Sequence, residues 1–145
     1  MDEPDQMTFQ ASAVAIEGRA LAITGPAGSG KSSLALALID RGGILIGDDG
    51  ITLRRDGRRI IALPPPNIAG LIEIRGIGIA EMPLAGPVPL ALILELGEAG
   101  ERLPEQADRA SILGLGIPKL GFSPGEIAPA VRAEWALRLH GIESS

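Results

Sequence analysis

The glycine-rich segment at residues 25–32 constrains the fold more than any other part of the chain. It reads Gly25-Pro26-Ala27-Gly28-Ser29-Gly30-Lys31-Ser32. This GxxxxGKS spacing is that of a phosphate-binding loop (P-loop), which lies between a buried strand and a helix. The apolar run at 20–24 predicts that strand, and the Leu- and Ala-rich residues 32–41, followed by two glycines, predict the helix. A chance glycine-rich turn would not have both flanks, so the segment predicts an α/β fold.

The same segment predicts phosphate chemistry. Gly25, Gly28 and Gly30 allow backbone N–H groups to turn toward phosphate oxygens, at a helix N-terminus whose dipole favours negative charge. Lys31 adds a positive charge near the β- and γ-phosphates, and the Ser32 hydroxyl is placed to bind magnesium. We therefore expect ATP and Mg²⁺ as cofactors, with the whole segment 25–32 contacting the nucleotide.

The 145 residues, of which 46% are hydrophobic, suffice for one domain with a sizeable core. We predict a disordered tail at 1–7, a single domain at 8–140 and a C-terminal tail at 141–145. Strands are predicted at 8–16, 44–46 and 90–96, a hairpin at 51–63, a helix at 128–139, and a charged loop or short helix at 97–111. The expected architecture is a mixed β-sheet with flanking helices.

Charge and composition exclude several classes of function. With 13 basic and 18 acidic residues, the net charge of -5 disfavours nucleic acid and anionic membranes as partners. The absence of cysteine excludes disulfides and thiolate sites, and is compatible with a reducing cytoplasm. No apolar run approaches the ~20 residues of a membrane span, and the N-terminus is acidic where a signal peptide would be basic. These features predict a soluble, cytoplasmic protein.

Two adjacent acidic residues, Asp48 and Asp49, follow the strand predicted at 44–46. A carboxylate at a strand end beside a P-loop can reach magnesium or a substrate hydroxyl, so one could act as a general base and the other near the metal. Neighbouring strand residues point to opposite faces, which indicates separate roles. The alternative is a solvated Asp-Asp-Gly turn.

Other charged residues are weaker candidates. Glu73 and Arg75 lie in an otherwise apolar stretch, where charges must be paired with each other or bound to a metal or phosphate. Glu95 and Glu98 end an apolar run, either as magnesium-ordering carboxylates or as an ordinary surface strand end. His140 lies five residues from the C-terminus, and no catalytic role is expected for it.

Taken together, three segments resemble the bacterial HPr kinase/phosphorylases, and the resemblance covers most of residues 8 to 130. The segments are the P-loop and its helix up to Arg41-Gly42, then Gly47-Asp48-Asp49, then residues 71–79, LIEIRGIGI, which is similar to the family signature. The family phosphorylates a serine of the phosphocarrier protein HPr and reverses the reaction by phosphorolysis. This chain is similar to the short, kinase-domain-only forms seen in α-proteobacteria.

The resemblance implies a role for each matching residue. Asp49 becomes the proton acceptor for the attacking serine, and the proton donor in the reverse reaction, with Asp48 in support. Lys31 contacts phosphate, and Ser32 and Glu73 hold magnesium. The family also forms hexamers, which implies a homo-oligomer here.

One further residue assignment and two departures also follow from the resemblance. Arg102 matches an active-site arginine. Gln10 stands where the family has a histidine, and glutamine cannot titrate. Glu126 replaces positive charge in the loop that supports dephosphorylation, where it would repel a phosphoserine. Phosphorolysis is therefore expected to be weak or absent while the kinase reaction survives.

Three functions remain open from the sequence. The first is an ATP-dependent serine kinase acting on HPr. The second is a small-molecule P-loop kinase, in which residues 73–79 would have no evident role. The third is an ATP-binding regulator that has lost turnover, which the departures at Gln10 and Glu126 would explain.

Overall fold

The protein is a mixed α/β domain in a computed structural model, which describes residues 5–66, 70–97 and 107–143. The first seven elements in chain order are β1 (Gln6–Phe9), β2 (Ser12–Ile16), β3 (Arg19–Thr24), α1 (Lys31–Asp40), β4 (Ile44–Gly47), β5 (Ile51–Asp56) and β6 (Arg59–Leu63). The remaining six are β7 (Leu71–Ile74), β8 (Gly78–Glu81), β9 (Val88–Leu96), β10 (Asp108–Ile112), β11 (Leu115–Phe122) and α2 (Pro129–His140). This confirms the predicted fold class.

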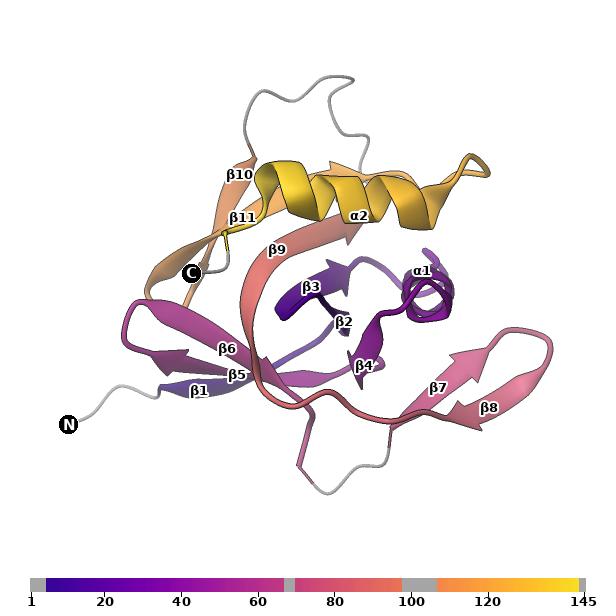
Figure 1. The fold of residues 1–145 in the computed structure, drawn as a ribbon, viewed down its shortest axis with the longest axis horizontal. Helices are drawn as coiled ribbons and strands as arrows, with labels where there is room; N and C mark the ends of the chain where they lie inside the picture. Colours follow the sequence, from indigo (N-terminus) through magenta and orange to yellow (C-terminus); the bar gives the residue numbers. More distant parts are fainter. Residues whose placement is uncertain (1–4, 67–69, 98–106, 144–145) are drawn as a thin grey trace.

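Strand β9 organises the sheet. One of its edges pairs with β3 in parallel, while the other pairs first with β6, antiparallel at residues 88–89, and then with β11, parallel at 93–96. The nine-stranded sheet runs β1-β5-β6-β9-β3-β2-β4, and β10 joins through β11. Changing partners along one edge requires a bend, and β9 is drawn as a long curved arrow in Figure 1. Strands β7 and β8 form a separate hairpin.

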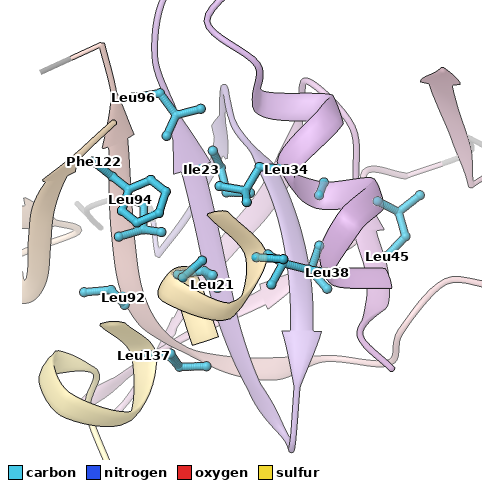
Figure 2. Packing of buried hydrophobic residues seen from close by; sticks show 14 of the residues in the cluster. Leu21, Ile23, Leu34, Leu38, Leu45, Leu92, Leu94, Leu96, Phe122 and Leu137 are labelled. Carbon is cyan, nitrogen blue, oxygen red and sulfur yellow. The ribbon is translucent and has the colours of Figure 1, made fainter. Parts of the chain in front are cut away.

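Two buried clusters hold the domain together, one on each face of β3. Leu21 and Ile23 of β3 pack with Leu34 and Leu38 of α1 and Leu137 of α2, as Figure 2 shows. The alanines that alternate with them belong to the second cluster, which β5, β6, β10 and β11 cover. Each fully buried leucine or isoleucine contributes about 1.5–3 kcal/mol. Within the described chain, helices thus cover one face of β3 and strands close over the other.

The two helices are joined by an ion pair. Helix α1 ends where Gly42, with φ of 111°, adopts a conformation that favours glycine. Arg41 lies between Asp40, the last residue of α1, and Gly42. It donates to Glu134 of α2 from Nε and Nη2, both at 3.0 Å. The Glu134 carboxylate is buried, and its hydrogen bond and charge raise the pKa of the Arg41 guanidinium above its usual value. The Arg41 guanidinium therefore stays charged, and the ion pair fixes the end of α1 against α2.

Most predicted elements are confirmed with small shifts in their ends. The strands at 44–46 and 90–96, the hairpin at 51–63, the P-loop helix and the C-terminal helix are all present. Strand β9 is covered on both faces, as its apolar run predicted. In the portion of the chain that the structure describes, neither helix is long and apolar enough to span a membrane.

Three predictions were wrong in part. The disordered tail predicted at 1–7 wrongly includes Gln6 and Met7. Both residues pair with β5, and Met7 packs on the second cluster. The loop or helix predicted at 97–111 contains a strand at 108–111, because β11 pairs with it across a turn in which Leu113 and Gly114 both have positive φ. In both cases the partner strand, which local composition does not reveal, stabilises the element. The strand predicted at 8–16 is two strands, interrupted at residues 10–11.

Candidate functional site

A cleft of about 910 Å³ lies between the P-loop and the β7–β8 hairpin. Four parts of the chain line it: the link between β1 and β2, the P-loop with the start of α1, the turn after β4, and the hairpin. The lining residues are 25–28 and 30–33 of the P-loop with Gln10, Asp48, Asp49, Glu73, Arg75 and Gly76. The structure therefore brings most of the predicted site residues into one cleft.

The P-loop has the backbone geometry that its glycines predict. Gly25, Gly28 and Gly30 have φ values of 145°, 81° and 101°, all in the region that favours glycine. A side chain at Gly25 would also meet the Leu96 carbonyl oxygen at 3.0 Å, because the loop packs on the end of β9. Helix α1 begins at Lys31, so its N-terminus and dipole are at the cleft.

Lys31 lies over the P-loop itself. Its Nζ donates to the carbonyl oxygens of Gly25 at 2.9 Å and Pro26 at 3.1 Å. The ammonium group is thus held at the mouth of the loop, where a phosphate would be attracted to it. Ser29 is the one residue of the predicted 25–32 set that does not line the cleft, and its buried Oγ has no hydrogen-bond partner among the described residues.

Asp48 connects three elements at the floor of the cleft. Its Oδ1 accepts hydrogen bonds from Ser32 Oγ of α1 at 2.6 Å and from Ser12 Oγ of β2 at 2.8 Å. Its Oδ2 accepts from the backbone N–H of Glu73 in β7 at 3.3 Å. A carboxylate with donors on both oxygens is fixed in place. Asp48 is therefore held beside the P-loop serine.

Asp49 is arranged differently from its neighbour. Its backbone adopts φ of 64°, a left-handed conformation that aspartate tolerates better than most residues. Its side chain is exposed in the cleft, and no hydrogen bond or ion pair to that side chain is found among the described residues. The two aspartates thus differ in environment: Asp48 is bound by the protein and Asp49 is free to act on a ligand.

The β7–β8 hairpin brings charged residues to the other side of the cleft. Ile72 is buried against α1, so the alternation of the strand turns Glu73 toward the cleft. Arg75 and Gly76, in the turn that follows, also line it. Glu73 and Arg75 form no ion pair in the part of the chain that is described, so the salt-bridged turn that was the alternative is not observed.

The oxygen atoms of the cleft suit magnesium. Across residues 5–66, 70–97 and 107–143, no group of three or more histidine, cysteine or acidic side chains could hold a metal without help. Mg²⁺ in phosphoryl-transfer sites needs only one or two carboxylates, because substrate phosphates and water supply its remaining ligands. The Ser32 hydroxyl beside Asp48, with Glu73 across the cleft, provides hard oxygen donors of this kind. The residues present therefore fit a magnesium–nucleotide complex.

The remaining candidate residues lie outside the cleft or are not among the residues that the structure describes. Arg102 and Glu98 fall outside the described residues. Glu95 forms an ion pair with Lys119 at 3.1 Å and does not line the cleft. Glu126 is exposed in the segment between β11 and α2, and it does not line the cleft either. His140 is the last residue of α2.

Sequence reasoning missed Ser12. Its hydroxyl touches both the Asp48 side chain and the Asp49 backbone, but it is 36 residues from Asp48 in the chain. Nothing local marks this serine, because it stands at the start of an ordinary apolar strand. Only the pairing of β2 with β4 gives it a place in the site.

A strand, a glycine loop and a helix that present Lys31 and Ser32 to facing carboxylates define a P-loop nucleotide-binding domain. Residues 4–85 match the family model described as HPr Serine kinase C-terminal domain. The chain therefore belongs to the HPr serine kinase C-terminal domain family.

Individual relatives agree with this assignment. The chain is 36% identical over 120 residues to the HPr kinase/phosphorylase of Shouchella clausii (strain KSM-K16), covering 74% of this chain and 39% of that protein. It is 32% identical over 148 residues to the HPr kinase/phosphorylase of Burkholderia cenocepacia (strain HI2424), covering 89% and 46%. The chain spans less than half the length of these curated relatives.

A solved structure matches over nearly the whole fold. The Hpr(Ser) kinase/phosphatase from Coxiella burnetii superimposes with a TM-score of 0.79 at 31% sequence identity, covering 91% of this chain and 94% of that one. The curled mixed sheet and the two helices are therefore those of this family.

Proposed function

We propose that this protein is an ATP-dependent serine kinase that acts on the phosphocarrier protein HPr. The observation that carries the proposal is the contrast between the two aspartates. Asp48 is bound beside the P-loop serine, while Asp49 is exposed in the same cleft without a protein partner. A phosphoryl-transfer site needs both a group on the metal side and a free carboxylate for the acceptor hydroxyl.

Each residue has a role in this proposal. Asp49 accepts the proton of the attacking serine hydroxyl and orients it toward the γ-phosphate. The loop 25–32 and Lys31 bind the phosphates and stabilise the charge that develops on them. Ser32, with Asp48 behind it, and Glu73 hold magnesium, which when bound neutralises phosphate charge. Arg102 is proposed as a further active-site cation on the strength of the family resemblance.

The reverse reaction is proposed to be weak or absent. Gln10 lines the cleft and cannot exchange a proton. Glu126 lies four residues after β11, whose carboxyl end is at the same edge of the sheet as the ends of β3 and β9. At that edge its negative charge would oppose a phosphoserine. Pyrophosphate released from phospho-HPr and inorganic phosphate would contradict this part of the proposal.

The decisive experiment is transfer of labelled phosphate from ATP to purified HPr. Wild-type protein should label HPr, and label should be lost both with Asp49→Asn and with an HPr that lacks its regulatory serine. Binding of a fluorescent ATP analogue to the same samples controls for folding and nucleotide affinity. Absence of label despite nucleotide binding would refute the kinase and favour the second candidate, an ATP-binding regulator, for which the glutamine in the cleft is the supporting observation.

A small-molecule kinase is tested in parallel with a panel of sugars and nucleosides. Turnover of one of these without HPr labelling would replace the protein substrate in the proposal. For assembly, we propose a homo-oligomer, by resemblance a hexamer, which the exposed side chains of Trp135 and Leu139 on α2 would help to form. Size-exclusion chromatography with light scattering measures the number of subunits, and a monomer at all concentrations would contradict it.

A further inference from the structure

Ser12 is the buried polar residue that contacts both aspartates. It is the first residue of β2, with no exposed surface, and it does not line the cleft. Its hydroxyl donates to Asp48 Oδ1 at 2.8 Å and accepts from the Asp49 backbone N–H at 3.3 Å. A serine hydroxyl has one donor, so its hydrogen is fully committed to Asp48. One side chain thus connects to both members of the acidic pair.

The strand pairing explains why this contact exists. Ala13 of β2 lies opposite Gly47, the last residue of β4, and the ladder ends at this pair, after a register shift between Val14 and Ala13. The next two residues, Asp48 and Asp49, have left the sheet and lie beside Ser12. The Asp49 N–H therefore has no partner in the ladder, and a backbone donor that leaves a sheet needs another acceptor. The Ser12 hydroxyl supplies it.

The same contact supports an unfavourable backbone conformation. Asp49 has φ of 64°, which costs energy for any residue with a side chain and persists where surrounding contacts fix it. That conformation turns the Asp49 side chain into the cleft while the Asp48 side chain stays beneath the P-loop. Ser12 holds both aspartates in these positions, because its hydroxyl contacts the backbone N–H of Asp49 and a carboxylate oxygen of Asp48.

The contact to Asp48 is shared with the P-loop serine. Oδ1 of Asp48 has two hydroxyl donors, Ser12 and Ser32. A hydroxyl that donates its hydrogen keeps its lone pairs, so Ser32 can donate to Asp48 and would still present its oxygen to a metal ion. Ser12 thus fixes the carboxylate that in turn orients Ser32.

We propose that Ser12 is a positioning residue of the phosphoryl-transfer site, which fixes Asp48 for magnesium–nucleotide binding and Asp49 for the acceptor hydroxyl. The inference rests on the proposed function for the role of Asp49, but its effect on nucleotide binding does not require HPr. A hydrogen bond to a charged group is worth roughly a tenfold change or more in the equilibrium it supports. Removal of the hydroxyl should therefore be measurable in binding as well as in turnover.

The test compares Ser12→Thr with Ser12→Val, because threonine and valine have nearly the same shape but only threonine has a hydroxyl group. Ser12→Ala is included as a variant that adds no bulk. Binding of a fluorescent ATP analogue is titrated with Mg²⁺ and repeated in EDTA, and kcat and KM are measured with HPr. We expect Ser12→Val and Ser12→Ala to raise the Mg²⁺ concentration for half-maximal binding about tenfold and to lower kcat about tenfold, with KM for HPr unchanged. Ser12→Thr should stay within about threefold of wild type.

Three results overturn the proposal. The first is a Mg²⁺ titration of Ser12→Ala that superimposes on the wild-type curve. The second is equal loss in Ser12→Thr and Ser12→Val, which would make size rather than the hydroxyl responsible. The third is a loss in EDTA as large as that in Mg²⁺, which would indicate general disruption of the cleft. If wild type fails to label HPr but the Mg²⁺ shift of Ser12→Ala is present, the proposed kinase function fails and the Ser12 assignment stands.

Discussion

Truncation of one isoleucine, Ile72, should weaken the attachment of the β7–β8 hairpin to the rest of the domain. The hairpin is not hydrogen-bonded into the nine-stranded sheet, and a two-stranded hairpin alone is marginally stable. Ile72 has no exposed surface and belongs to the cluster formed with α1. Glu73, the next residue, lines the cleft. Ile72→Ala should therefore reduce stability and also disturb the placement of Glu73.

The size of the effect follows from the burial of the side chain. Replacing a fully buried isoleucine with alanine costs about 2–5 kcal/mol, because apolar contacts are lost and a cavity remains. For a domain of this length, each kcal/mol lowers Tm by about 4 °C. We expect Tm to fall by about 8–20 °C. The Mg²⁺ concentration for half-maximal nucleotide binding should rise several-fold at temperatures where the variant is still folded.

The matched control is Ile79→Ala on the partner strand. Ile79 pairs directly with Glu73, but 71% of it is exposed, so its truncation should change Tm by no more than about 2 °C. Circular dichroism melting and magnesium titrations with a fluorescent ATP analogue measure both variants. Equal Tm shifts in Ile72→Ala and Ile79→Ala would refute the anchoring of the hairpin through Ile72. A large Tm shift with unchanged magnesium dependence would refute its coupling to Glu73.

Three further predictions concern charges. Lys31→Met should weaken ATP-analogue binding at least about tenfold while Tm changes by less than about 3 °C, because the hydrogen bonds of its ammonium group to described residues all go to the P-loop. A larger Tm loss would contradict this. Glu134→Gln should lower Tm by about 3–6 °C at both pH 7 and pH 9. The pKa of Arg41 is raised, so the stability contributed by its ion pair with Glu134 is lost only when the pH exceeds that raised value. The control Glu17→Gln removes an exposed ion pair at 3.8 Å and should have no effect on Tm. Glu126→Arg should increase pyrophosphate formation from phospho-HPr, and an unchanged rate would remove Glu126 as the cause of weak phosphorolysis.

The parts of the fold that the sequence predicted well are those whose determinants are local. The strand, glycine loop and helix around Lys31 follow one another directly, and each step has its own residue signal. The hairpin at 51–63 likewise turns directly after Asp56, at Gly57 and Arg58, between two strands with apolar segments. In such segments the residues that determine the structure are close neighbours in the chain.

The parts that were missed depend on distant partners. Strand β11 contains Gly116, Pro118 and Gly121, which disfavour a strand on local grounds, but it pairs in parallel with β9 and antiparallel with β10. Gln6 and Met7 are in a strand only because β5 lies beside them. Composition can assign such residues to tails or loops, because the stabilising hydrogen bonds are made with residues far along the chain.

The same distinction between local and distant determinants applies to the candidate site. Motifs and the family resemblance singled out Lys31, Ser32 and Asp49, and the sequence also indicated separate roles for Asp48 and Asp49. The contacts that make the two aspartates different could not be read from the sequence. That difference depends on where β4 ends against β2, since this pairing brings Ser12 beside both residues. A motif therefore indicates which side chains are present, and the sheet register determines what each one can do.

The hydrogen bonds of Asp48 suggest why the P-loop, the acidic turn and the hairpin occur together in one small domain. Asp48 joins Ser32 of α1, Ser12 of β2 and the backbone of Glu73 in β7, elements that are otherwise linked mainly through the apolar cluster around α1. Movement of any one of them changes the surroundings of the same carboxylate. Since Ser32 and Glu73 are the proposed magnesium ligands, the metal site is stable only when all three elements are in place. Variants at Ser12 and Ile72 should consequently share one phenotype, a greater demand for Mg²⁺, although their side chains belong to different strands and only one of them touches Asp48.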